Sequence, residues 1–361
     1  MYCSPLQSSA RTIIPAAIRE WLGALLSGPL PGSRTRRHAA CLFALGRIGD
    51  FVLTLSALRL LVREFGATNC VLVVPNPLAI LAGREFPGVQ CITLPTEAAS
   101  LMREILPIWW RERNKFSADS FDQLICLSHQ RSLYYELALS WIDTARDVRL
   151  LPETYPTVSG EDVPASHRPD DGGPASHRLS DGWCTELLAH QRLVETVLGR
   201  AIGQEEILPR FTSLTASEDG RLLIYPFSRD ATRCLPLEKV VGVLQNWRAR
   251  SRGAIVFGGN LVDTPELERY AQAARSTGLD NISIELPSGL DGLLKHVAQA
   301  GAVFAADSAA AHVATALDKP SAVMTTRLFY GYCQPWGRSG RQHVFLPDAP
   351  ADQVAGALPA L

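Results

Sequence analysis

The feature that most constrains the fold is an alternation of short apolar runs with amphipathic segments, which begins at residue 39 and recurs in both halves of the chain. Residues 49–65, for example, place Val52, Leu55, Leu58 and Val62 on one helical face. Strands that alternate with helices predict a parallel sheet that is covered by helices on both faces. The predicted strands are 39–45, 70–74, 89–94, 121–127 and 148–151, then 221–225, 254–257, 283–286, 302–306 and 321–324.

Between the two halves the composition changes, because Pro, Gly, Ser, Asp and His are frequent in residues 152–182. This segment contains a tandem duplication, PASHRPDDG followed by PASHRLSDG. Its paired His-Arg dipeptides are compatible with a ligand site, but a duplicated low-complexity linker explains them better. We therefore predict an N-terminal extension at 1–38, a Rossmann-like domain at 39–151, a linker at 152–182 and a second Rossmann-like domain at 183–361.

The N-terminal extension contains a mildly amphipathic segment, residues 12–26, and a basic run at 34–38 (RTRRH). These features are compatible with an anchor at a membrane surface, but a helix packed on the domain or a loose extension is the favoured interpretation. Arg11, Arg19 and Glu20 interrupt a secretory layout, and no apolar run approaches the ~20 residues that span a bilayer. We expect a cytoplasmic protein, with peripheral contact at the inner face of the inner membrane as the alternative.

Overall charge and cysteine spacing narrow the class of protein further. The net charge of −1 argues against a nucleic-acid partner, which normally requires a basic excess. The 8 cysteines form no C-x-x-C pair, and several lie in apolar runs. Buried, reduced thiols in a cytosolic protein are the simplest explanation, and no metal site is expected.

The first candidate motif is LGRIGD at 45–50, between the first predicted strand and the helix that follows it. Gly46 and Gly49 permit a tight turn and a close approach of a ligand to the backbone. Asp50 lies at the helix start, where a carboxylate could accept a proton from a substrate hydroxyl. A carboxylate there is also a favoured helix cap, and the spacing alone favours the cap.

The second motif is YPFSRDATRCLP at 225–236, which follows a strand of the second half. Ser228, Thr232 and Arg233 place two hydroxyls and a guanidinium before a helix that begins near Pro236. Phosphate groups bind well at such helix N-termini. A polar loop before a proline-started helix has the same pattern.

The third motif is DSAAAH at 307–312, after the predicted strand AVFAA. Asp307 and Ser308 are good helix N-caps, and the N–H groups of Ser308 and Ala309 could hold a pyrophosphate. His312 lies one turn further along the helix. A capped core helix with a satisfied histidine is an equally good interpretation of this motif by itself.

Together these motifs resemble the bacterial heptosyltransferases, also called glycosyltransferase family 9. Members of that family show a Gly-Asp pair before an apolar helix, matched here by 49–50 followed by FVLTLSALR. They show Lys-x-Trp-Pro after a second-half strand, matched by 233–236 (RCLP). They also show Asp-Thr-Gly-x-x-His followed by A-A-L-x-K-P, matched by 307–312 and by 314–320 (ATALDKP). The order and spacing agree over about residues 39–345.

The resemblance implies a GT-B fold, in which two Rossmann-like domains face each other across a cleft. It also implies an inverting, metal-independent and cofactor-free transfer of a sugar, heptose first, from a nucleotide-diphosphate donor that is expected to be ADP-linked. The acceptor would be a glycan or glycolipid such as the lipopolysaccharide core. By this resemblance the N-terminal domain binds the acceptor and the C-terminal domain binds the donor.

The resemblance also assigns roles to residues. Asp50 corresponds to the general base, and Arg233 to the lysine that contacts the donor phosphate. Acceptor contacts fall to Gly49 and to Arg131 in the loop 128–132 (SHQRS), although a lone arginine is more often a solvated charge. The segment 258–263 (GGNLVD) would approach the nucleoside, with Asn260 and Asp263 both candidates for the ribose. The implied donor-binding residues are Ser228, Thr232, Arg233, Gly259, Asn260, Asp307, Ser308, Ala309 and His312.

The chain departs from the family pattern at Arg233 for Lys, Leu235 for Trp, Ala309 for Gly and Ser56 for Pro. Arginine keeps the charge but adds a wider planar fork. These departures motivate an alternative function, a catalytically inactive nucleotide-sugar-binding GT-B protein with a regulatory role. A nucleotide-sugar epimerase is a further alternative, but it would need additional carboxylates and histidines that the sequence does not identify.

Overall fold

A computed structural model describes residues 36–95, 112, 114–116, 119–128, 144–150, 185–217, 219–326 and 339–361 of this protein. The described residues divide into two compact units. Of the described residues, the first unit contains those within 36–46, 57–150 and 189–201, and the second contains those within 47–56, 185–188 and 202–361. The predicted linker 152–182 and residues 1–35 lie outside the described residues, so the predicted domain boundaries stay predictions.

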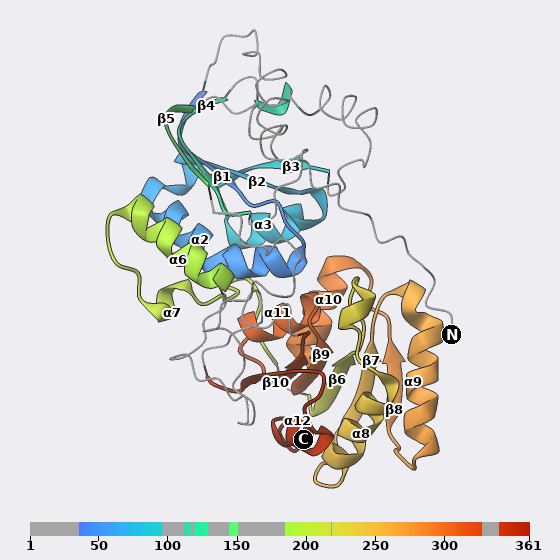
Figure 1. Ribbon diagram of the computed structural model, residues 1–361. Coiled ribbons are helices and arrows are strands. Elements are labelled where there is room, and N and C mark those ends of the chain that lie inside the picture. Colours follow the sequence, from blue (N-terminus) through green and yellow to red (C-terminus); the bar gives the residue numbers. More distant parts are fainter. Residues whose placement is uncertain are drawn as a thin grey trace. The chain divides into compact units, whose positions relative to one another are not determined.

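The first unit is built on a five-stranded parallel sheet with the strand order β3-β2-β1-β4-β5 (Figure 1). Each of these strands overlaps a run that the sequence predicts as a strand. Their bounds are β1 Arg36–Phe43, β2 Cys70–Pro75, β3 Gln90–Leu94, β4 Asp119–Cys126 and β5 Thr144–Leu150. Three helices are described between or after these strands in the chain. They are α2 (Ile48–Phe65), α3 (Ala79–Glu85) and α6 (Thr185–Leu198).

Strand β1 begins at Arg36, earlier than the predicted start at residue 39. The reason is a set of cross-strand ion pairs with β4, which sequence periodicity does not reveal. Arg36 Nε lies 3.0 Å from Asp119 Oδ1, and His38 Nε2 lies 3.2 Å from the same oxygen. Arg37 Nε donates to Asp122 Oδ1 at 3.1 Å. The end of the basic run 34–38 is therefore neutralised by carboxylates of the neighbouring strand.

The second unit is built on a six-stranded parallel sheet with the order β11-β10-β9-β6-β7-β8. This is the strand order of the doubly wound dinucleotide-binding folds. The five strands predicted for this half are confirmed, and β11 is an addition. The bounds are β6 Arg221–Tyr225, β7 Ala254–Gly258, β8 Ile282–Glu285, β9 Ala302–Ala306, β10 Ser321–Met324 and β11 Gln342–Phe345.

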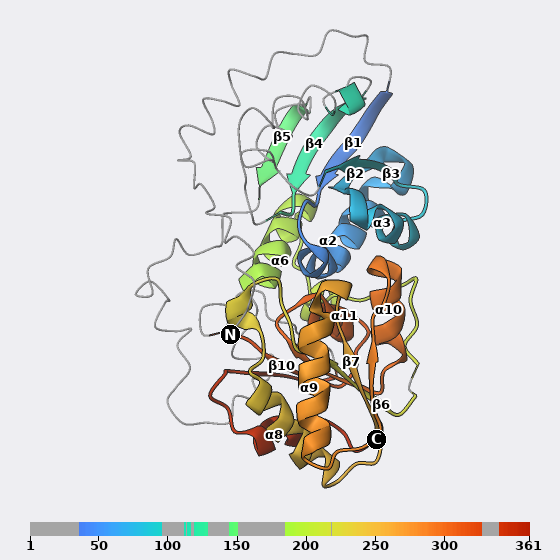
Figure 2. The same cartoon turned by 90° about the vertical axis from the view of Figure 1, so that its right-hand side faces the viewer.

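Helices cover both faces of the second sheet, and its central strands are accordingly buried along nearly their whole length. On one face Leu222, Ile224 and Phe304 pack in a core with Trp247 of α8 and Tyr270 of α9. On the other face α10 and α11 lie side by side in both views (Figures 1 and 2). The helices are α8 Leu237–Arg248, α9 Thr264–Ser276, α10 Gly289–Gln299, α11 Ala309–Ala316 and α12 Ala351–Gly356, after the short α7 Gln204–Ile207.

Each sheet has one point at which the direction of strand addition reverses, between β1 and β4 in the first and between β6 and β9 in the second. Open parallel sheets bind ligands beyond the carboxyl ends of the strands at such points. The motif 45–50 follows β1, the motif 225–236 overlaps the end of β6, and the motif 307–312 follows β9. The fold thus places every predicted motif at a reversal point of its own sheet. No helix within the described ranges is both long and apolar enough to span a bilayer.

Candidate functional site

Asp307 is the centre of a buried polar cluster at the carboxyl ends of β6, β9 and β10. Only 1% of its surface is exposed. Its Oδ2 accepts a hydrogen bond from the Thr325 hydroxyl at 3.1 Å and from Arg233 Nη1 at 3.4 Å. Its Oδ1 lies 3.7 Å from His312 Nε2. The strand order brings these residues together, because β6 and β10 are the two neighbours of β9.

The partners of Asp307 keep it charged at neutral pH. Burial by itself would raise the pKa of this carboxyl. Interactions with His312, Arg233 and Thr325 outweigh burial, so that the pKa lies below its ordinary value. A buried carboxylate beside a guanidinium and an imidazole is a preorganised electrostatic arrangement of the kind found in functional sites.

Arg233 is held at the end of a short 3-10 turn, Ala231–Arg233, with 13% of its side chain exposed. Asp230 caps that turn, since its Oδ1 accepts from both the N–H of Thr232 at 3.0 Å and the Thr232 hydroxyl at 2.7 Å. Asp230 Oδ2 also lies 3.9 Å from Arg233 Nε. The Thr232 hydroxyl therefore has a structural partner, while the guanidinium lies between two carboxylates.

The same loop is closed at its base by main-chain contacts. The N–H of Leu235 donates to the carbonyl of Pro226 at 2.8 Å, and the N–H of Ser228 donates to Cys234 Sγ at 3.4 Å. Leu235, which stands where the heptosyltransferases that the sequence resembles have Trp, is buried in the core beside α9. The loop is thus fixed by packing on one side, and it presents Arg233 on the other.

The first turn of α11 leaves two buried polar atoms without a hydrogen-bond partner. Ser308 precedes the helix in an extended conformation, and its side chain does not cap it. Ser308 Oγ and His312 Nδ1 are both buried and unpartnered within the described part of the chain. Buried polar atoms normally have partners, so these two atoms beside a helix N-terminus leave hydrogen-bonding capacity that a polar ligand would satisfy.

Gly49 lies against the same histidine. Residues Arg47–Ser56 belong to the second unit, as does His312. A Cβ on Gly49 would lie 2.7 Å from His312 Cδ2, closer than van der Waals contact allows. The packing of this imidazole therefore requires a glycine here, a reason that the sequence did not show.

Asp50 lies in the first turn of α2, and its Oδ2 accepts a hydrogen bond from the N–H of Arg47 at 2.8 Å. Asp50 is therefore the third residue of the helix and not its N-cap residue, but its carboxylate still caps the helix start, because it accepts from the residue that precedes the helix as in a capping box. Capping occupies one carboxylate oxygen and leaves the proposed role in proton transfer as a prediction.

The segment 258–263 is shaped by its own packing. A Cβ on Gly258 would lie 2.6 Å from the ring of Tyr225, and one on Gly259 would lie 2.9 Å from Leu267 Cδ1. Asp263 Oδ2 accepts from the N–H of Asn260 at 2.9 Å and caps the turn Leu261–Asp263. Internal contacts thus explain both glycines, and the donor contacts of Gly259 and Asn260 stay predictions.

Sequence reasoning missed two contributions. Thr325 follows β10, and its position after a predicted strand was the available signal. His296 on α10 contacts Tyr225 and Glu285. These contacts depend on tertiary packing, and no sequence motif predicts them. Arg131 lies outside the described residues.

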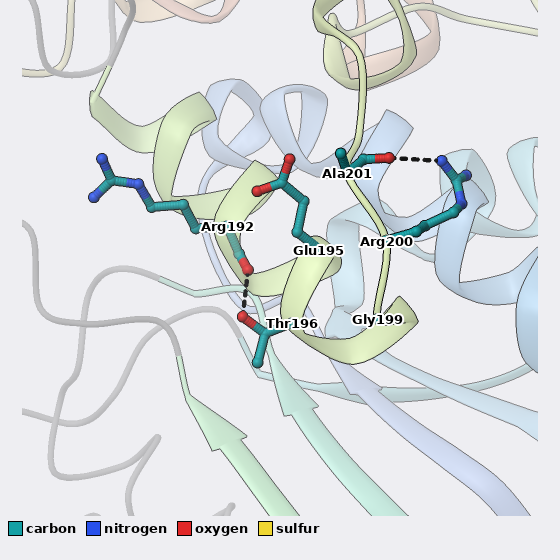
Figure 3. Close-up of a pocket in the computed structure, with 6 residues that line it drawn as sticks. All are labelled: Arg192, Glu195, Thr196, Gly199, Arg200 and Ala201. Carbon is teal, nitrogen blue, oxygen red and sulfur yellow. Dashed lines mark hydrogen bonds between the residues drawn. The ribbon is translucent and has the colours of Figure 1, made fainter.

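A shallow pocket at the end of α6 contains none of the predicted site residues (Figure 3). The side chains of Arg192 and Arg200 point in opposite directions there, and the Thr196 hydroxyl bonds to the carbonyl of Arg192 at 2.7 Å. These groups do not converge on a common ligand. Among the described residues no group of three or more His, Cys, Asp or Glu side chains is placed to bind a metal ion.

Solved structures of heptosyltransferases share this fold. The E. coli heptosyltransferase WaaC with ADP superposes with a TM-score of 0.60 at 15% identity, over 89% of this chain and 97% of that one. E. coli ADP-heptose lps heptosyltransferase II gives 0.58 at 14%, over 88% and 97%. The glycosyl transferase family 9 protein from Veillonella parvula DSM 2008 gives 0.55 at 14%, over 87% of each chain. The chain therefore has the GT-B fold of these glycosyltransferases.

Comparison of the sequence alone finds no similar protein: no family model matches the chain, and no curated protein matches it.

Proposed function

We propose that this chain, which has the fold of the heptosyltransferases, is an inverting glycosyltransferase that uses a nucleotide-diphosphate sugar. ADP-heptose is the first donor to consider, since the solved structures of similar fold include one with ADP and one with ADP-2-deoxy-2-fluoro heptose. The acceptor is a glycan or glycolipid hydroxyl, with a lipopolysaccharide core sugar as the leading choice. The enzyme works in the cytoplasm or at the inner face of the inner membrane.

The observation that carries this proposal is the cluster of Arg233, Asp307, Ser308 and His312. It combines a guanidinium with a helix N-terminus and with two buried polar atoms that lack partners among the described residues. A diphosphate offers oxygens to all of these donors, and a helix N-terminus favours a negative charge. Asp307 is the counter-charge that holds Arg233 and His312 in place before the ligand arrives.

In the proposed mechanism Asp50 accepts the proton of the acceptor hydroxyl. The resulting oxygen nucleophile attacks the anomeric carbon on the face opposite the phosphate. The bond from that carbon to the phosphate oxygen breaks, and the nucleoside diphosphate leaves with the electron pair. Arg233 and the N–H groups at the start of α11 offset the charge that develops on the leaving group.

The proposal is tested by mixing the purified protein with ADP-, UDP- and GDP-sugars, and by measuring thermal stability and slow release of the nucleoside diphosphate. We expect one donor class to raise the melting temperature and to be hydrolysed slowly. Arg233→Ala should weaken donor binding as well as turnover, whereas Arg233→Lys restores the residue typical of the similar family and should retain both. Absence of any nucleotide-sugar binding would refute the proposal.

An inactive sugar-nucleotide-binding protein is the second candidate, and it is favoured by Leu235 and Ala309 at positions where the similar family has Trp and Gly. It predicts the same thermal shift without donor hydrolysis and without transfer to any acceptor. The same experiment therefore separates the two functions.

A further inference from the structure

A second cluster of titratable side chains lies in the second unit and is not used by the mechanism above. The Tyr225 hydroxyl at the end of β6 lies 3.1 Å from His296 Nδ1 on α10. His296 Nε2 lies 3.0 Å from Glu285 Oε2 at the end of β8. Glu285 in turn accepts from Arg221 Nη1 at 3.1 and 3.2 Å. The four residues form a continuous series of polar contacts that links the two ends of β6 through α10 and the edge strand β8.

The carboxylate of Glu285 favours a proton on Nε2 of the imidazole, because the two groups lie 3.0 Å apart. A proton on Nε2 faces Glu285, so the neutral ring has a free acceptor at Nδ1. The Tyr225 hydroxyl then donates to Nδ1. A second proton on the ring would occupy Nδ1, and the buried Tyr225 hydroxyl would lose its acceptor there.

Tyr225 is joined to one of the loops assigned to the donor and packs against the start of the other. It directly precedes Pro226, whose carbonyl closes the loop that carries Arg233. Its ring also fills the space beside Gly258, since a Cβ there would lie 2.6 Å from the ring, and Gly258 leads into the segment 258–263. A change in the orientation of the Tyr225 side chain would therefore shift the loop after β6 and the loop after β7.

We propose that His296 is a positioning residue for the donor site, and that through Tyr225 it holds both loops in the binding conformation only while Nδ1 is unprotonated. This inference rests on the function proposed above. It adds a proton-controlled step to donor binding that is separate from the chemistry of Asp50.

The surroundings of His296 favour the neutral ring. Burial lowers the pKa of His296 more than the neighbouring Glu285 carboxylate raises it, and Arg221 adds to the lowering, while Asp219 acts weakly in the opposite direction. Burial also raises the pKa of Tyr225, so its hydroxyl remains a donor. On α11, the helix beside α10, the titratable side chain is His312, which faces Asp307. Because the binding form is unprotonated, donor affinity is retained above the pKa of His296 and lost as the pH falls through it.

The test is the affinity of ADP, UDP and GDP for the whole chain, measured by calorimetry between about pH 8 and about pH 5. We expect the nucleotide that binds the wild type to bind roughly tenfold more weakly at the acidic end, the effect of one lost hydrogen bond. His296→Asn places a side-chain carbonyl near the position of Nδ1, where it accepts from Tyr225 but does not titrate, so affinity should stay high and the acidic decline should disappear. His296→Gln carries no titrating group either and should also lack the decline. Tyr225→Phe should bind more weakly throughout, with no acidic decline.

His343→Gln is the matched control, because burial also lowers the pKa of His343, and that residue lies on β11 beside Phe345. It should keep the acidic decline of the wild type. If the decline persists in His296→Gln, or if Tyr225→Phe retains it, the inference is wrong while the proposed function stands. If no nucleoside diphosphate binds the wild type at any pH, the proposed function and this inference both fail. Tyr225→Phe removes a single oxygen, so it remains informative if His296→Gln does not fold.

Discussion

At the scale of single residues, Asp50 has a structural role that the structure shows and a chemical role that stays a prediction. Its Oδ2 caps the start of α2 through the N–H of Arg47. The side-chain oxygen of asparagine can accept the same hydrogen bond, so Asp50→Asn separates capping from proton transfer.

We expect Asp50→Asn to reduce turnover by about 10²–10⁴-fold, the usual contribution of a general base, and to leave donor affinity nearly unchanged. Steady-state kinetics together with calorimetry check this prediction. Asp352→Asn is the control, since Asp352 also lies in the first turn of a helix. A wild-type rate in Asp50→Asn would show that Asp50 caps the helix and takes no part in proton transfer.

Gly49 provides a second prediction at this scale. Gly49→Ala would place a methyl group 2.7 Å from His312 Cδ2. We expect a loss of about 1–3 kcal/mol in the free energy of unfolding from overpacking, with weaker donor binding. Urea titration measures the first effect. Gly83→Ala, at another helical glycine where an added Cβ would meet no described heavy atom within 4 Å, should be neutral or slightly stabilising. Equal stability of the two variants would contradict the packing described for His312.

At the scale of secondary-structure elements, Asp307 ties the ends of β9 and β10 to the loop after β6. The pKa of Asp307 is lowered by folding, so its charge stabilises the native state above the ordinary aspartate value. That stabilisation is lost as the pH falls through the lowered value.

Asp307→Asn should therefore cost about 1–3 kcal/mol in the free energy of unfolding near neutral pH. The difference from the wild type should begin to shrink below about pH 4, where the unfolded chain binds a proton, and should disappear only below the lowered pKa of the native carboxyl. Denaturant titrations at several pH values check this. A difference that does not change with pH would show that the charge of Asp307 is not what stabilises these elements.

The matched segment 314–320 illustrates an element whose role the sequence did not reveal. Lys319 is buried, with 1% of its surface exposed, and donates hydrogen bonds to the carbonyls of Ala300 and Ser217. It joins the turns that precede β9 and β6. A lysine in a motif suggests a ligand contact, but here burial and two carbonyl partners give it a structural role.

At the scale of the whole molecule, the donor residues and Asp50 all belong to the second unit. A ligand that binds only the native state stabilises it by an amount set by its concentration, about 2.7 kcal/mol at 100 times Kd. We expect a bound nucleoside diphosphate to slow amide hydrogen exchange in 226–236 and 307–312, and to leave β1–β4 of the first unit nearly unchanged. Exchange measured by mass spectrometry with and without the nucleotide checks this, and Arg233→Ala should abolish the protection. Protection confined to the first unit would contradict the donor assignment.

Sequence alone determined the identity and order of ten of the described strands, all but β11, because strands buried on both faces must be continuous apolar runs. It also located three motifs at strand ends. Only the tertiary structure decided which polar groups meet: Arg233 and Asp307 lie 74 positions apart and come together because β6 pairs with β9. The tertiary structure also explains why β1 begins earlier than predicted, since its first residues form ion pairs with β4. It shows that Gly49 packs against His312 and that His296 contacts Tyr225. Local periodicity reports burial, whereas the partner of a charged side chain depends on long-range strand order.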